Sequence, residues 1–125
     1  MNAAFYCMAR RPAPLSEDER EAVRKLEAKY SVESRIKRFQ ETGQGIDWRA
    51  WRFLPPEQFS AADTILEGSA ELPCESEESL ATAIAHWCNF ATGLRREVAK
   101  ALWEVRVGDR EIKHDYRNDR YDPAA

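Results

Sequence analysis

The sequence predicts an α+β domain in which an antiparallel sheet packs against two helices. Two segments repeat apolar residues at helical spacing, and others alternate apolar and polar residues or are continuously apolar, as strands are. In chain order the segments are strand, helix, strand, strand, helix, strand and a final hairpin strand. This is the element order of a ferredoxin-like split βαβ fold with an added C-terminal hairpin strand.

The first strand and the first helix lie in the first 30 residues. Residues 3–9 are apolar on both alternating faces, which is typical of a strand covered on at least one side. Ser16 and Glu19 then form a capping box, in which each side chain satisfies a free backbone N–H of the helix start. Behind this cap, apolar residues recur on one face as far as Tyr30, so we expect that face to pack on the sheet.

Residues 32–40 carry two patterns at once. Val32, Ile36 and Phe39 fit one face of a helix, whereas the alternation of apolar and polar residues fits a strand with one polar edge. We favour the strand. The glycine-rich sequence that follows ends this element, and residues 46–59 are expected to form an irregular loop rich in aromatic residues.

The second half of the chain begins with a clearer strand and helix. Residues 64–72 alternate with a period of two, and Pro73 ends the strand. Ser76 caps the second helix, in which apolar residues follow the i, i+3, i+4, i+7 rule. Gly93 ends or interrupts this helix, and we expect it to resume to about Ala101.

A hairpin is predicted at Gly108 and Asp109, which suit a two-residue turn. The turn sets the pairs across the two strands: Val107 with Arg110, Arg106 with Glu111, Val105 with Ile112, Glu104 with Lys113, and Trp103 with His114. Two opposite-charge pairs fall into register together, which favours this hairpin. We therefore expect one domain over residues 1–116, followed by a flexible tail at 117–125.

Composition and charge exclude several partners and compartments. The formal net charge of −3 leaves no basic excess for a phosphate backbone, so we expect no nucleic-acid partner. No apolar run is long enough to span a membrane and no signal peptide is recognisable, so we expect a cytoplasmic protein without a membrane partner. The three cysteines lack the spacing of a zinc site, and reduced thiols fit best.

The residues with chemical potential form no catalytic constellation. His86 has no second ligand at i+4, and His114 is followed by Asp115, whose side chain should point to the other face of the strand. Cys74 stands among acidic residues that oppose a thiolate. The GxG at Gly43 lacks the remainder of a phosphate loop. We therefore expect no enzyme activity, no cofactor and no metal ion.

Two features are candidates for a binding surface. Trp48, Arg49, Trp51 and Arg52 combine the residue types enriched in protein interfaces. The alternative is that the tryptophans complete the core of a small domain while the arginines are solvated. The second feature is an acidic run, which is a solvated face or a surface for a basic partner: Glu67, Glu71, Glu75, Glu77 and Glu78.

We expect a small protein-binding module, an inhibitor or neutraliser of another bacterial protein of the toxin-immunity or phage anti-defence type, that recognises a basic surface. A first alternative is a small-molecule-binding or enzymatic domain with a pocket near Trp48, Trp51, Trp103 and His114. A second is a non-catalytic subunit of a homo-oligomer. The oligomeric state stays open.

Overall fold

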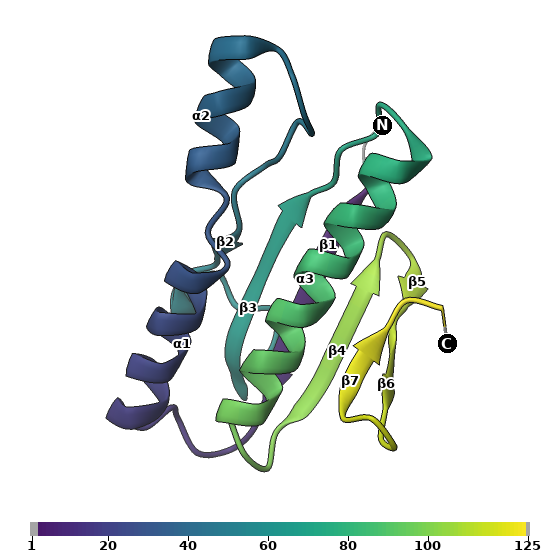
Figure 1. Cartoon of the computed structure of the whole chain (residues 1–125). Helices are drawn as coiled ribbons and strands as arrows, with labels where there is room; N and C mark the ends of the chain where they lie inside the picture. Colours follow the sequence, from purple (N-terminus) through teal and green to yellow (C-terminus); the bar gives the residue numbers. More distant parts are fainter. Residues whose placement is uncertain (1–2, 125) are drawn as a thin grey trace.

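The computed structural model describes residues 3–124. Its strands are β1 (Ala4–Arg10), β2 (Arg52–Phe53), β3 (Thr64–Glu71), β4 (Leu102–Val107), β5 (Arg110–Glu111), β6 (Lys113–Asp115) and β7 (Arg120–Asp122). Its helices are α1 (Glu17–Lys29), α2 (Glu33–Thr42) and α3 (Glu77–Glu97), with a short 3₁₀ turn at Pro56–Gln58. Figure 1 shows α1 and α3 side by side on one face of the sheet, with α2 projecting beyond it.

The main sheet has five antiparallel strands in the order β2-β3-β1-β4-β5, and β6 and β7 form a separate two-stranded sheet. β3 lies between β1 and β2, which are joined through α1 and α2. β1 lies between β3 and β4, which are joined through α3. Two interleaved βαβ units of this kind make a split βαβ arrangement, so the predicted α+β class is confirmed.

The prediction of a strand at residues 32–40 is wrong, because this segment forms α2. Val32 is buried, and Ile36 and Phe39 are half-buried on the same helical face while their neighbours are exposed. Gly43 then ends the helix in the left-handed region at φ 68°, a conformation that glycine adopts without strain. The strand that completes the sheet is β2, which lies in the segment expected to be a loop and pairs with Gly68 and Ser69 of β3.

The core lies between the sheet and the inner faces of α1 and α3. β1 contributes Phe5, Cys7 and Ala9, and α3 contributes Trp87 and Phe90 among others. Because these residues of β1 alternate with less buried ones, the helices cover one face of the strand, as its apolar pattern required. The thiol of Cys7 is buried, and burial raises its pKa to about 12, so it behaves as a small apolar side chain.

Helix α3 continues through Gly93 and ends at Glu97, four residues earlier than Ala101. Gly93 faces α1, where a Cβ atom at this position would lie 3.1 Å from Cδ2 of Leu26. The glycine therefore permits the close approach of the two helices and does not interrupt α3.

The predicted hairpin register is confirmed next to the turn, where Arg106 pairs with Glu111 and Val107 with Arg110. The amide of Ile112 also donates to the carbonyl of Val105 at 2.8 Å. Beyond this point the chain leaves the main sheet, and His114 pairs with Tyr121 of β7 instead of with Trp103.

Part of the segment expected to be a flexible tail forms β7 and packs against α3, while Ala125 is outside the described residues. Tyr121 is 5% exposed. Its amide donates to Oγ1 of Thr92 at 2.9 Å, and its hydroxyl accepts from Arg95 at 3.0 Å. A buried aromatic ring, one side-chain hydrogen bond and one backbone hydrogen bond anchor β7, which the mixed composition of this segment did not reveal.

Replacing Tyr121 by Ala should lower the free energy of unfolding by about 3 kcal/mol, because a buried aromatic ring and the hydrogen bond from Arg95 to its hydroxyl are lost. Tyr116 is 79% exposed, so Tyr116→Ala is a matched control that should cost less than about 1 kcal/mol. Urea unfolding of both variants measures the difference. Equal stability of the two variants would show that residues 117–125 do not belong to the folded domain.

Candidate functional site

Trp48 and Trp51 belong mainly to the core, as the second interpretation of the Trp/Arg segment expected. Trp48 is 5% exposed. Its ring lies 6.5 Å from the ring of Trp87, and the Arg35 guanidinium covers it at 5.1 Å. Trp51 is half-buried. Trp48 is therefore closed to a partner, and the exposed parts of this segment are Arg49 and Arg52.

Trp51 lies directly over Gly68 of β3. A Cβ atom at position 68 would be 2.9 Å from the indole Nε1 of Trp51 and 2.8 Å from the carbonyl oxygen of Arg52. The ring of Trp51 also lies 5.4 Å from that of Trp87 and 5.1 Å from that of Phe90. The absence of a side chain at Gly68 thus allows the segment before β2 to close the aromatic core.

His86 has a structural role at the junction of α1, α2 and α3. Its Nε2 lies 2.8 Å from the carbonyl oxygen of Tyr30, and because a carbonyl can only accept, Nε2 carries the hydrogen. Burial lowers the pKa of His86 and the Arg35 charge lowers it further, against the opposing effect of the bond to Tyr30. The neutral imidazole therefore links α3 to the end of α1.

Glu67 does not belong to an exposed acidic face, because its side chain is 2% exposed. Its carboxylate accepts from the amide of Ser60 at 2.8 Å, from the hydroxyl of Ser60 at 2.5 Å and from the hydroxyl of Tyr6. Burial alone would raise the pKa of Glu67, but these hydrogen bonds outweigh it and hold the pKa below its usual value. The carboxylate fastens the segment around Ser60 onto β3.

Replacing Glu67 by Gln should lower the free energy of unfolding at pH 7 by about 1–3 kcal/mol, because an amide cannot accept all three of these hydrogen bonds as well as a carboxylate does. The pKa of Glu67 is depressed in the folded state, so its contribution is present above the unfolded pKa and is lost as the pH falls through the folded pKa. The free energies of unfolding of the wild type and of Glu67→Gln should therefore converge at acidic pH.

Glu71→Gln is the matched control for this variant, since Glu71 lies on the same strand and is exposed. It should change the free energy of unfolding by less than about 0.5 kcal/mol. Urea unfolding at pH 7 and at acidic pH measures both variants. If Glu67→Gln proves no more destabilising than Glu71→Gln, the interior role of Glu67 is refuted.

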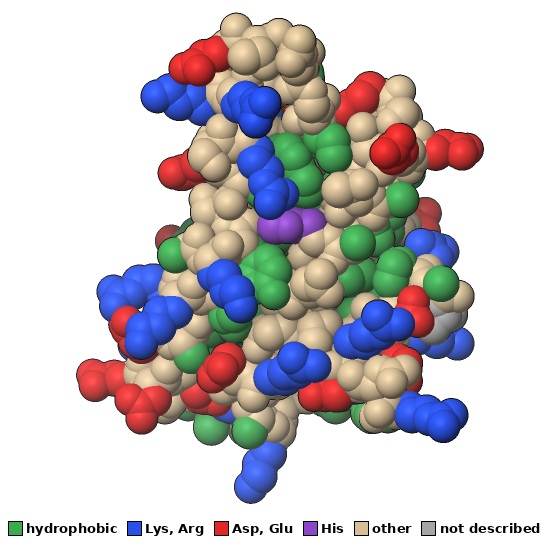
Figure 2. Space-filling model, in the orientation of Figure 1, with side chains coloured by type: hydrophobic (Ala, Val, Ile, Leu, Met, Phe, Trp, Pro, Cys, Tyr) green, Lys and Arg blue, Asp and Glu red, His purple; other side chains and the backbone are tan. Residues whose placement is uncertain are grey.

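The other four acidic candidates form one exposed surface, which we call the acidic corner: Glu71, Glu75, Glu77 and Glu78. It lies where β3 ends and α3 begins, and Figure 2 shows acidic side chains over the start of α3, at the upper right. Glu75 is fixed in place by the amide of Asp47, which donates to its Oε1 at 3.0 Å and helps to lower its pKa.

The charge of the acidic corner is not neutralised within the described part of the chain. None of its four carboxylates forms an ion pair with a Lys or Arg of residues 3–124, whereas Glu19, Asp63 and Asp119 each pair with an arginine. Acidic residues in the first turn of α3 also lie at the positive end of the helix dipole, which stabilises them as carboxylates. The corner therefore presents negative charge to solvent.

His114 lies in a second cluster, between α3 and the C-terminal hairpin. Asp115 does not reach it, as predicted, and instead accepts from the amides of Arg117 and Asn118. The acidic partner is Asp119, whose Oδ1 lies 3.1 Å from Nε2 of His114. Sequence reasoning missed Asp119 because a turn with φ 50° at this residue brings it back toward the strand.

The four residues expected to line one pocket are distributed over three. Trp51 lines a pocket that has the α1–α2 junction on one side and α3 on the other. Trp48 lines a second pocket, together with Arg35 and Arg38. Trp103 and His114 line a third pocket of about 240 Å³ beside α3. The pocket predicted near Trp48, Trp51, Trp103 and His114 therefore does not exist as one site.

The sheet edges bear on the homo-oligomer alternative. The edge strands β2 and β5 each have two residues. β2 covers only Gly68 and Ser69 of β3, and β5 covers only Arg106 and Val107 of β4, so the short edge strands do not exclude association through the sheet. The oligomeric state stays a prediction to be measured.

Comparison of the chain with known protein families, with curated proteins and with solved structures found no match. Within residues 3–124, no helix combines the length and the apolar character needed to cross a membrane. No three His, Cys, Asp or Glu side chains of this part of the chain come together as ligands for a metal ion. Any proposal of function therefore rests on the surfaces and pockets of the chain itself.

Proposed function

We propose that this chain is a small, non-catalytic protein-binding module whose acidic corner contacts a basic surface of another protein. The observation that supports it is the set of four exposed carboxylates at one end of the sheet, without ion pairs among the described residues. Unpaired charge of one sign attracts a surface of the opposite sign and fixes the orientation of the complex.

A rigid support favours this surface as a binding site. The corner is attached to β3 and α3, and the inner face of α3 is packed into the core through Trp87, Phe90 and Leu94. Glu75 is held by its hydrogen bond to the backbone of Asp47. The carboxylate of Glu75 is therefore positioned before a partner arrives, which lowers the entropic cost of association. Arg49, which pairs with Asp47, borders the same surface.

The class of partner follows from the charge. A basic protein surface is complementary to the corner, whereas a phosphate backbone would be repelled by it. We assign the chain to inhibitors or neutralisers of another bacterial protein, of the toxin-immunity or phage anti-defence type, acting in the cytoplasm. Such inhibitors require a stable surface and no chemistry of their own, which agrees with this arrangement.

Neutralising the corner should slow association with the partner. In Glu77→Gln/Glu78→Gln two of the four charges are lost while the bond between Glu75 and Asp47 remains. We expect proteins captured from a bacterial lysate by the wild type to associate about three- to tenfold more slowly with this variant at low salt. Surface plasmon resonance at about 50 and 500 mM salt should show the difference shrinking as screening increases.

Glu17→Gln/Asp18→Asn is the matched control, because it removes two exposed carboxylates from the first turn of α1. Each variant removes two negative charges from the first turn of a helix, so the control separates an effect of the acidic corner from a general effect of net charge. Association that is slowed equally by both variants, or by neither, would contradict the proposed function.

A further inference from the structure

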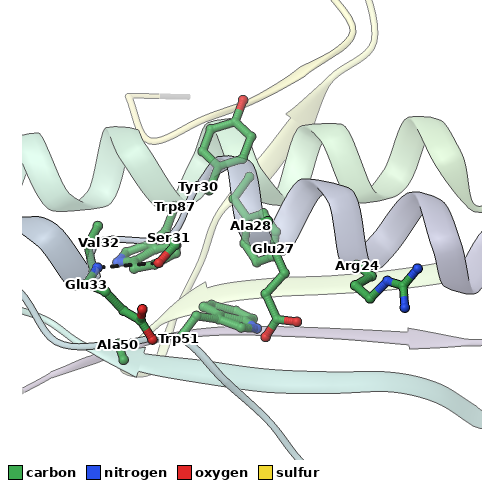
Figure 3. A pocket seen from close by; sticks show the side chains of 11 residues that line it. Arg24, Glu27, Ala28, Tyr30, Ser31, Val32, Glu33, Ala50, Trp51 and Trp87 are labelled. Atoms are coloured by element: carbon green, nitrogen blue, oxygen red, sulfur yellow. Dashed lines mark hydrogen bonds between the residues drawn. The ribbon is translucent and has the colours of Figure 1, made fainter.

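A pocket of about 490 Å³ lies between the junction of α1 with α2, the segment before β2, and α3. Figure 3 shows the aromatic rings of Tyr30, Trp51 and Trp87 and the carboxylates of Glu27 and Glu33 around it. Phe90 also lines the pocket. A pocket of this size and mixed lining is suited to a small organic molecule. It shares no residue with the acidic corner.

Glu27 is the unusual residue of this pocket. It is half-buried, and it forms no hydrogen bond or ion pair with any residue of the described chain. Two other acidic side chains with restricted exposure have partners: Glu19 pairs with an arginine, and Glu67 accepts three hydrogen bonds. Burial without compensation raises the pKa of Glu27, which shows the cost of its charge. A cation beside it would offset that cost.

Neither Arg24 nor the indole nitrogens of the pocket occupy the place of a cation beside Glu27. Arg24 lines the pocket but forms an ion pair with Glu21, and in Figure 3 its guanidinium lies away from Trp51. The Nε1 atom of Trp51 is closed to solvent and Trp87 is 1% exposed, so a ligand meets the carbon surface of the Trp51 indole. Figure 3 shows the Trp51 indole between the Glu27 and Glu33 carboxylates.

Aromatic rings and carboxylates attract the same kind of ligand. The electrons of an aromatic face attract a cation, and the attraction is strongest for an organic cation whose charge is weakly hydrated. A small inorganic ion would gain nothing from the apolar walls. An anion would be repelled by both carboxylates.

We propose that this pocket binds an alkylammonium group, with the ammonium beside Glu27 and its alkyl groups against Trp51. The same chemistry occurs in free quaternary ammonium compounds and in a methylated lysine side chain of a protein. This site lies at the junction of α1 with α2, so it is independent of the partner surface proposed above.

Choline and its neutral isostere 3,3-dimethylbutan-1-ol test the proposal, since the two have nearly the same shape and differ in charge. Tryptophan fluorescence, confirmed by calorimetry, should give a saturable response to choline at constant ionic strength and at least about tenfold weaker binding of the alcohol. Binding of the alcohol as tight as that of choline would overturn the proposal.

Glu27→Gln should weaken choline binding about five- to tenfold, because the amide keeps the shape of the side chain and loses its charge. Glu17→Gln, which removes a carboxylate from the same helix outside the pocket, should leave the affinity within about twofold. Circular dichroism establishes that both variants are folded. Equal affinity of the two variants for choline would contradict the role of Glu27.

A short peptide with one trimethyllysine distinguishes the two sources of the ligand. Tighter binding of this peptide than of choline supports a protein side chain as the natural ligand, and the reverse order supports a free ammonium compound. The same peptide with unmodified lysine should bind more weakly than its trimethylated form, because the unmethylated ammonium is more strongly hydrated. Failure of choline and the trimethylated peptide alike to bind would overturn the proposal.

Discussion

The contact of Trp51 with Gly68 holds together the parts of this fold that come from different regions of the chain. A glycine in the interior of β3 leaves room for the backbone of Arg52 and for the Trp51 indole, both less than 3 Å from the place of a Cβ atom. Trp51 in turn packs on Trp87 and Phe90 of α3. The same contact places β2 on the edge of the sheet and forms one wall of the pocket beside Glu27.

Elements whose signals are local were predicted correctly from the sequence. The caps at Ser16 and Ser76 mark the starts of α1 and α3, since each serine bonds a backbone N–H three residues away. The register beside Gly108 follows from the turn and from the pairing of Arg106 with Glu111. In these cases the interacting residues are neighbours in the chain, so their spacing is visible in the sequence.

Elements that depend on distant contacts were not predictable in the same way. Residues 32–40 have a pattern that fits a helix or a strand; α2 forms in this segment, and β2 takes the edge position beside β3. Glu67 alternates like a surface residue but is buried by the segment around Ser60. Tyr121 falls in the segment expected to be a flexible tail. Its partners Thr92 and Arg95 lie on α3, far from it in the chain, so its burial is not visible in the local sequence. Tertiary contacts decide all three cases.

The packing of the tryptophans into the core determines which side chains remain on the surface. With Trp48 closed and Trp51 and Trp87 committed to the core, the Trp/Arg segment contributes mainly exposed charge, and the acidic corner becomes the clearest surface for a partner. Figure 2 shows basic side chains over much of the face formed by the helices, and acidic side chains both over the start of α3 and at the lower left, around the start of α1.

Gly68 provides the space in which the aromatic core closes, and the stability of Gly68→Ala measures how much the fold depends on that space. The added methyl group would lie 2.8 Å from the carbonyl oxygen of Arg52, which is backbone and cannot move without displacing β2. Urea unfolding should show a loss of more than about 2 kcal/mol, with altered tryptophan fluorescence in the native state. If the variant is as stable as the wild type and its fluorescence is unchanged, the aromatic core does not depend on the space at Gly68.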